Sequence, residues 1–502
     1  MGASLLEQVR GLLDDAIDAA DGTTRSELEG VRARLDEPLR VAIAGRVKAG
    51  KSTLLNALVG EELAPTDAGE CTRLVTWYQD GVTYRVTLEP RSGAARPLPF
   101  HRDDGALEID LEGTPPEEVD RLVVEWPSAS LRDATLIDTP GLASLSVDVS
   151  ERTQAFLGVD ETRPAAADAV VYLMRHLHTD DSSFLEAFHD DVGHASSINA
   201  IGVISRADEV GAGRLDSMES ARRIADRYRH EPTVRRLCQT VVPVAGLLAQ
   251  AGATLTEDEY RALARLAAAP RDDTDRLVLT ADRFLNSEAT IGLTPADRSR
   301  LATRLGLFGV RLAVALLRDG EVTSSRQLAA ELLTCSGIHE LREVLASQFA
   351  SRRDVLKARS ALVAVERAVR ADSGAGRERL LAEAERIESS AHVFAELHLL
   401  QGLRSGELEL PDDEIEVTER LLGASGTTLA ERVGLPVDAG ADDVRAALVG
   451  ALDRWQQRAE SPLSSRDVAR ASRVLVRSCE GMLTDLSASA QPSPSRISGV
   501  EV

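Results

Sequence analysis

The sequence predicts an α/β domain with a mostly parallel sheet flanked by helices, joined to an all-α helical bundle. Short apolar runs rich in β-branched residues alternate with helical segments as far as about residue 246, a pattern typical of parallel sheets. Beyond Gly252 the pattern is almost wholly helical as far as about Ser487. With 502 residues, the chain is long enough for two or three domains.

The first half of the chain provides the predicted strands. Apolar residues recur at helical spacing at the start of the chain, which predicts an opening amphipathic helix. They are Leu5, Leu6, Val9, Leu12, Leu13 and Ile17. A second helix is expected at roughly 26–35, before Pro38. Strands are then expected at 39–45, 74–79, 84–89, 134–141, 168–174, 198–205 and 240–246.

The helical half is punctuated by residues that end helices. Breaks are expected at Pro270, Pro295, 319–320, 336–337, Gly374, 402–411 and 423–426. The last strong helix is expected to begin after Ser464 and Ser465, which are candidate N-caps. The polar tail at 490–502 is predicted to be disordered.

Composition and charge restrict the classes of function. The formal net charge of -23 argues against a general nucleic-acid binder, because neutralising phosphates needs a basic face. Four scattered cysteines fit a reducing compartment and form no zinc or disulfide framework. The longest apolar run, 305–317, is too short to span a bilayer and contains Arg311. We therefore expect a cytoplasmic protein without a membrane span.

The run "GRVKAGKS" at 45–52 matches the phosphate-binding pattern G-x-x-x-x-G-K-[ST]. It lies between an expected strand and an expected helix, which is the context that this motif requires. Lys51 is expected to reach the β- and γ-phosphates, and Ser52 to ligate Mg²⁺. The candidate phosphate contacts are Gly45, Arg46, Val47, Lys48, Ala49, Gly50, Lys51, Ser52 and Thr53.

A second motif, "LIDTPG", ends another apolar strand. Asp138 is expected to hold Mg²⁺ through water, and the Gly141 N–H to sense the γ-phosphate. A threonine is also needed between the two motifs, with its hydroxyl on Mg²⁺ and its carbonyl on the attacking water. Thr72, just before the strand that begins at Leu74, is our choice, and Thr66 is the competitor.

The third motif, "ISRADE", occupies the place where guanine recognition needs [NT]-K-x-D. Asp208 keeps the carboxylate that accepts from the guanine N–H groups, whereas Ser205 and Arg206 replace the usual first two residues. Arginine can stack on a base as lysine can. In "VPVAG", which follows at the next strand, the Ala245 N–H is expected to contact guanine O6.

These motifs, with the downstream run "LLTCSGIHELREVLASQFASRRDVLKARSAL", resemble the bacterial dynamin-like GTPases. More narrowly, the chain resembles the actinobacterial group of isoniazid-inducible and sporulation-septum dynamins, and is most like the shorter, span-free member of the isoniazid-inducible pair. The resemblance implies neck helices at 1–38, a dynamin-type GTPase domain at 39–350 and a helical bundle at 351–489.

Lysine occurs only at Lys48, Lys51 and Lys357 among 58 basic residues. Phosphoryl transfer needs positive charge beyond Mg²⁺ and the phosphate-binding lysine. The resemblance implies that eukaryotic dynamins obtain this charge from a bound monovalent cation, which a serine of the phosphate-binding loop helps to hold. In this sequence Lys48 occupies the position of that serine. Lys48 is therefore a candidate catalytic residue beside Lys51 and Thr72. The alternative is a lysine that pairs with the switch or covers the edge of the nucleotide.

The resemblance implies a GTPase that uses Mg²⁺, associates with itself through its GTPase domains and pairs with a second dynamin-like protein. It would contact lipid peripherally at the inner face of the cell membrane and remodel or stabilise that membrane. Two alternatives stay open. One is a regulatory GTPase switch whose helical part binds a protein, and the other is a structural septum component whose assembly GTP binding controls.

Overall fold

The computed structural model describes residues 4–64, 74–103, 106–139, 167–175, 199–287, 292–320, 322–371 and 376–489. The chain divides into two compact units. Unit 1 holds Met1–Ala20 and Val369–Val502, and unit 2 holds Asp21–Ala368. The predicted division at residues 38, 350 and 489 stays a prediction.

Unit 2 is built around a nine-stranded sheet in the order β11-β10-β9-β1-β8-β2-β7-β3-β4. Five of its neighbouring pairs are parallel and three are antiparallel, which confirms the predicted α/β class. All seven predicted strands are present. They are β1 (Leu39–Gly45), β2 (Thr76–Asp80), β3 (Arg85–Pro90), β8 (Ala134–Asp138), β9 (Ala169–Met174), β10 (Ala200–Ser205) and β11 (Val241–Val244).

Four strands between β3 and β8 were not predicted. They are β4 (Arg96–Pro97), β5 (Phe100–Asp103), β6 (Ala106–Ile109) and β7 (Val119–Trp126). β7 is inserted between β2 and β3, and its burial does not follow the strict alternation of a half-exposed strand. β5 and β6 pair separately as a two-stranded antiparallel ribbon.

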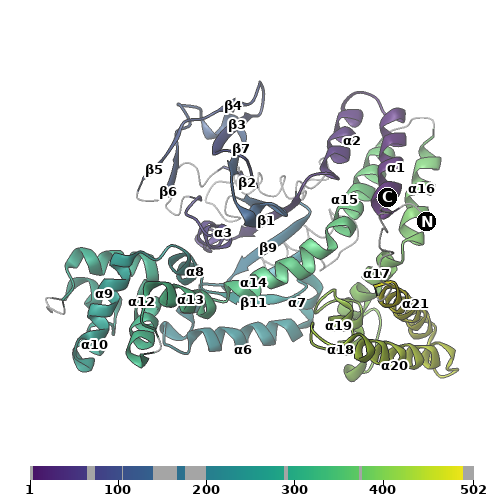
Figure 1. The fold of residues 1–502 in the computed structure, drawn as a ribbon. Coiled ribbons are helices and arrows are strands. Elements are labelled where there is room, and N and C mark those ends of the chain that lie inside the picture. Colours follow the sequence, from purple (N-terminus) through teal and green to yellow (C-terminus); the bar gives the residue numbers. More distant parts are fainter. Residues whose placement is uncertain are drawn as a thin grey trace, which may run out of the picture. The chain divides into compact units, whose positions relative to one another are not determined.

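Helices cover both the faces and one edge of this sheet. A buried cluster of Tyr172, Met174, Ile204, Leu237 and neighbouring residues joins β9 and β10 to α6 and α7. Figure 1 shows α8, α9, α10, α12 and α13 gathered at the β11 edge, where they share a buried core with residues of α6. The α-helices described between Asp21 and Ala371 are α2 (Gly22–Arg34), α3 (Lys51–Val59), α6 (Ser217–His230), α7 (Pro232–Leu237), α8 (Gly246–Ala253), α9 (Glu257–Ala268), α10 (Arg271–Leu277), α11 (Ala281–Asn286), α12 (Pro295–Asp319), α13 (Ser325–Cys335), α14 (Ile338–Val344) and α15 (Arg353–Ala371).

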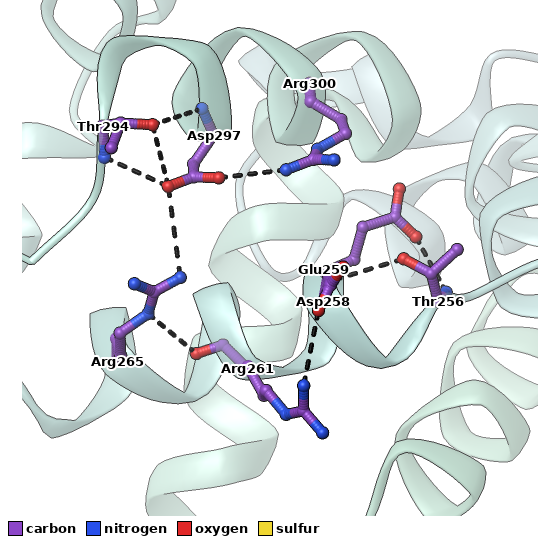
Figure 2. Close-up of polar contacts among 8 residues, drawn as sticks. All are labelled: Thr256, Asp258, Glu259, Arg261, Arg265, Thr294, Asp297 and Arg300. Carbon is purple, nitrogen blue, oxygen red and sulfur yellow. Dashed lines mark hydrogen bonds and ion pairs between the residues drawn. The ribbon is translucent and has the colours of Figure 1, made fainter. Parts of the chain in front are cut away.

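Local sequence explains where several of these helices begin. Thr256 and Glu259 form a reciprocal capping box at α9, and Thr294 and Asp297 form another at α12 (Figure 2). Each box gives hydrogen-bond acceptors to two backbone N–H groups at a helix start, those of the N-cap residue and of the third helical residue. The predicted break at Pro295 is confirmed, since Pro295 is the first residue of α12.

Unit 1 is wholly helical in its described residues. It contains α1 (Leu5–Ala19), α16 (Arg377–Ser390), α17 (His392–Ser405), α18 (Asp412–Leu421), α19 (Leu429–Arg432), α20 (Ala441–Glu460) and α21 (Arg466–Ser489). The Ser465 hydroxyl accepts a hydrogen bond from the Val468 N–H at 3.2 Å, which confirms the predicted cap. None of the described helices is long and apolar enough to cross a membrane.

Candidate nucleotide site

The phosphate-binding loop joins the end of β1 to the start of α3. Gly45 has φ 145°, and a Cβ there would lie 2.6 Å from the Leu173 carbonyl oxygen of β9, so only glycine fits. Gly50 has φ 92° and is the N-cap of α3, a left-handed conformation that glycine adopts without strain. The loop therefore ends with the free N–H groups of a helix N-terminus facing the carboxyl edge of the sheet.

Lys51, Ser52 and Asp138 come together at this edge. The Ser52 hydroxyl donates to Asp138 Oδ2 at 2.9 Å, while Lys51 Nζ donates to the carbonyls of Gly45 at 3.4 Å and Arg46 at 3.5 Å. Burial raises the pKa of Asp138, against the opposing effects of the Lys51 charge and the Ser52 hydrogen bond. Burial also lowers the pKa of Lys51, which Asp138 opposes. Both charges are thus held in a desolvated place, where a polyvalent anion or cation interacts strongly.

The third motif lies beside the phosphate-binding loop. Arg206 Nη2 donates to the Lys48 carbonyl at 3.1 Å, and Arg206 Nη1 donates to Glu209 Oε1 at 2.9 Å. Arg175 pairs with the other oxygen of Glu209 at 3.1 Å. Burial raises the pKa of Asp208, and the Glu209 charge adds to this effect while the two arginines oppose it. Hydrogen bonds and ion pairs of Arg206, Arg175 and Glu209 therefore position this loop.

A cavity of about 160 Å³ opens between the two loops. The phosphate-binding loop and α3 form one wall of the cavity, and the strand ends of β9–β11 form another. The start of α8 completes the lining. Its lining residues are Ala49, Gly50, Thr53, Leu54, Leu173, Val203, Ser205, Arg206, Asp208, Glu209, Val244, Gly246 and Leu247. The lining combines apolar residues with the polar residues Ser205, Arg206, Asp208 and Glu209, and such a cavity can hold a flat base that donates hydrogen bonds to a carboxylate.

The prediction for Ala245 needs correction. The Ala245 N–H donates to the Ser336 carbonyl at 2.9 Å, and the residue is fully buried. That amide is already satisfied by the turn before α14, so it does not face the cavity. Gly246 and Leu247, the first residues of α8, line the cavity in its place.

Other predicted residues are placed differently. The Lys48 side chain is exposed, and its backbone has φ 62°. The Ser205 hydroxyl donates to the Met174 carbonyl at 3.3 Å, within the wall of the cavity. Thr72, Thr66 and Gly141 lie outside the described residues.

Sequence reasoning missed part of the site. Leu173, Gly246, Leu247 and Glu209 all line the cavity, yet none was singled out. The signal for Glu209 was present, since it is the last letter of "ISRADE". The two α8 residues directly follow "VPVA", so a helix N-terminus at that point would have indicated them.

The comparisons with known proteins agree on one family. Residues 41–206 match the Dynamin family. The isoniazid-induced protein IniC of Mycobacterium tuberculosis is 43% identical over 494 residues, which cover 97% of this chain and 99% of that protein.

More distant similarities are shorter or weaker. A bacterial dynamin-like protein of Nostoc punctiforme is 32% identical over 147 residues, 27% of this chain and 20% of that protein. A solved structure of an oligomerised bacterial dynamin pair aligns with 97% of this chain and 74% of its own, at 13% identity and a TM-score of 0.34. The assignment follows from the long sequence match: the chain belongs to the dynamin family, in the group of the isoniazid-induced protein IniC.

Proposed function

We propose that the protein binds GTP with Mg²⁺ and hydrolyses it to GDP and phosphate. The observation that carries this proposal is the contact of Ser52 with Asp138 at the same sheet edge as the cavity that contains Asp208. A phosphate-binding loop, a metal-compatible oxygen pair and a base-sized cavity thus lie together. Membership of the dynamin family supports the same reaction.

The residues present fit Mg²⁺. Ser52 and Asp138 offer hydroxyl and carboxylate oxygens, the ligands that Mg²⁺ prefers. Burial raises the pKa of Asp138 despite the neighbouring Lys51 charge, so a bound cation would stabilise the ionised carboxylate. When bound, the metal would neutralise the developing charge on the phosphates. Thr72 stays the proposed third oxygen donor.

Asp208 is the proposed determinant of base specificity. Asp208 lines the cavity, and its carboxylate would accept hydrogen bonds from the ring N–H and amino groups of guanine, which adenine does not present in that arrangement. Arg206 covers the loop edge of the cavity, held there by Lys48 and Glu209. Ser205 and Arg206, which stand at the first two positions of the usual guanine motif, both line the cavity.

Lys48 is the proposed source of additional charge in the transition state. A lysine at φ 62° costs about 1 kcal/mol relative to glycine, and such strain is commonly retained at functional sites. Its side chain is exposed, and in this proposal it approaches the γ-phosphate of bound GTP. Compared with a bound monovalent cation, a covalently attached ammonium would make turnover independent of the kind of salt.

We further propose that the protein associates with itself and with a paired dynamin-like protein on the inner face of the cell membrane, and remodels or stabilises that membrane. Support comes from membership of the dynamin family and from the similarity to a bacterial dynamin-like protein of Nostoc punctiforme. GTP turnover with and without anionic liposomes tests this, together with sedimentation of the protein with those liposomes. Stimulated turnover and co-sedimentation are expected.

The net charge of -23 favours a second candidate, a regulatory switch that binds a protein and no membrane. The same experiment separates the two functions. Absence of co-sedimentation under every condition, with the suspected partner present or absent, would leave the switch and remove the membrane function.

A further inference from the structure

Two helices of unit 2 begin at the nucleotide cavity. Gly50, Thr53 and Leu54 line it from the start of α3, and Gly246 and Leu247 line it from the start of α8. The two helix starts are in contact, because a Cβ on Gly246 would lie 3.6 Å from Thr53 Cγ2 and 3.7 Å from the Leu54 nitrogen. The width of the cavity therefore depends on how α3 and α8 sit against each other.

The same two helices end at one arginine. Arg304 of α12 pairs with Glu62, which follows the α3 C-cap Gly60 by two residues. Arg304 Nη2 donates to both the carbonyl and the hydroxyl of Thr254, the C-cap of α8, at 3.0 and 2.7 Å. One guanidinium thus bridges the far ends of both helices. A cation is favourable there because the C-terminal end of a helix carries partial negative charge.

Arg304 is itself held firmly. Its Nε donates to Glu259 Oε1 at 3.0 Å, and Glu259 is only 2% exposed. The other oxygen of Glu259 accepts from the Thr256 N–H at 2.9 Å, within the capping box of α9 (Figure 2). All three guanidinium nitrogens are therefore engaged by different elements, which lysine could not reproduce.

The segment after α3 is also fixed. The Asn56 side chain accepts from the Leu63 and Ala64 N–H groups at 2.9 and 2.7 Å and donates to the Ala64 carbonyl at 2.9 Å. Glu62 is consequently a rigid extension of α3, so that its pairing with Arg304 constrains the helix and not a loose loop.

We propose that Arg304 is a positioning residue that sets the separation of α3 from α8, and through it the fit of a ligand that contacts the phosphate-binding loop and the base cavity at once. This inference rests on the proposed GTP-binding function and deepens it. A second contact supports the role of α12: the helix is interrupted at Gly306, with φ 65°, where a Cβ would lie 3.4 Å from Leu247 of the cavity wall.

The inference makes a distinction between ligands. GTP contacts both helix starts, whereas inorganic tripolyphosphate contacts only the phosphate-binding loop. Releasing the far ends of the helices should therefore weaken the binding of GTP and spare that of tripolyphosphate. A residue that merely stabilised the fold or the loop would affect both ligands equally.

Two variants test this, each with a matched control. Glu62→Gln keeps the side-chain shape and removes the charge, and Glu61→Gln makes the same change next to it, where Glu61 binds Arg102 and Trp126 instead. Arg304→Lys is matched by Arg300→Lys, one turn earlier on α12, where the exposed Arg300 pairs with the partly buried Asp297 at 3.0 Å (Figure 2).

The measurement is the dissociation constant of a fluorescent GTP analogue with Mg²⁺, and its displacement by tripolyphosphate, after thermal melting has shown each variant to be folded. We expect Glu62→Gln and Arg304→Lys to weaken GTP binding about fivefold to tenfold, with tripolyphosphate unchanged. Equal weakening for both ligands, or no difference between a variant and its control, would overturn the inference. Failure of the unsubstituted protein to bind GTP would instead overturn the proposed function, and the inference with it.

Discussion

Arg206 Nη2 donates to the backbone carbonyl of Lys48 at 3.1 Å, joining the proposed base-binding loop to the phosphate-binding loop across 158 residues of chain. Both residues have left-handed backbones, with φ 52° and 62°. Strain at two contacting residues, neither of them glycine, indicates that surrounding structure holds the two loops in this relation. The two halves of the candidate site are therefore joined by a direct hydrogen bond within the protein.

Replacing Arg206 with alanine should weaken GTP binding about tenfold, because the contact between the loops and a hydrogen bond to a charged group are both lost. Arg206→Lys should recover only part of the affinity, since an ammonium does not reproduce the guanidinium fork. Arg223→Ala, which removes an exposed pair with Glu219 on α6, is the matched control. Isothermal titration with GTP measures all three, and equal affinities would contradict the role of Arg206.

Asp138→Asn should lower both the affinity for Mg²⁺ and the rate of turnover by about 10- to 100-fold, because it removes the charge that would orient the metal's water ligands. The amide oxygen can still accept from Ser52, so the fold should be preserved. A Mg²⁺ titration of GTP turnover provides the measurement. Wild-type turnover at saturating and at limiting Mg²⁺ would contradict this assignment.

Lys48→Ala and Lys48→Gly separate charge from strain. Both should reduce GTP turnover about tenfold or more if Lys48 supplies charge to the transition state. Glycine alone should also raise the free energy of unfolding of the nucleotide-free protein by about 1 kcal/mol, since it relieves the strain at φ 62°. Turnover across sodium and potassium concentrations, compared with chemical denaturation, checks both effects. Unchanged turnover in both variants would favour the structural alternative for Lys48.

Lys357, the third lysine of the chain, should make stability depend on pH. It is 3% exposed in α15, and its Nζ donates to the Arg34 carbonyl. Burial lowers the pKa of Lys357 to about 8, with Asp168 opposing and Arg353 and Arg34 adding to the effect. The unfolded lysine keeps its proton to about pH 10.5, so folding is favoured increasingly as the pH rises from about 8 to 10.5.

The test for Lys357 compares the pH dependence of the unfolding free energy in two proteins. The unfolding free energy of the unsubstituted protein minus that of Lys357→Met should rise by up to about 3 kcal/mol between pH 7.5 and 10.5. Subtraction removes the titration of all other groups, which both proteins share. A flat or falling difference would show that Lys357 keeps its charge when buried.

Local sequence predicted the central strands and the helical half because their apolar periodicity is strong. β7 was missed although its sequence, "VDRLVVEW", contains an apolar run. Its position between β2 and β3 depends on pairing with strands that are distant or follow a different order in the chain, and periodicity carries no information about such pairing. The capping boxes at Thr256 and Thr294 are local and could have been read directly.

The site divides in the same way. The residues of the phosphate-binding loop and Asp138 could be proposed from contiguous motifs, and the structure brings Ser52 and Asp138 into contact. The Ala245 amide was assigned incorrectly because its acceptor, the Ser336 carbonyl, comes from a turn 91 residues later. Arg304 could not be found from sequence, since none of its partners, Glu62, Thr254 and Glu259, lies within a helical turn of it.

The central claim is that this site hydrolyses GTP and selects guanine. Steady-state phosphate release from GTP and from ATP, by the purified protein and by Lys51→Ala, tests it most directly. We predict turnover of GTP that depends on Mg²⁺, little turnover of ATP, and loss of both signals in Lys51→Ala. Equal turnover of GTP and ATP, or phosphate release that survives in Lys51→Ala, would contradict it.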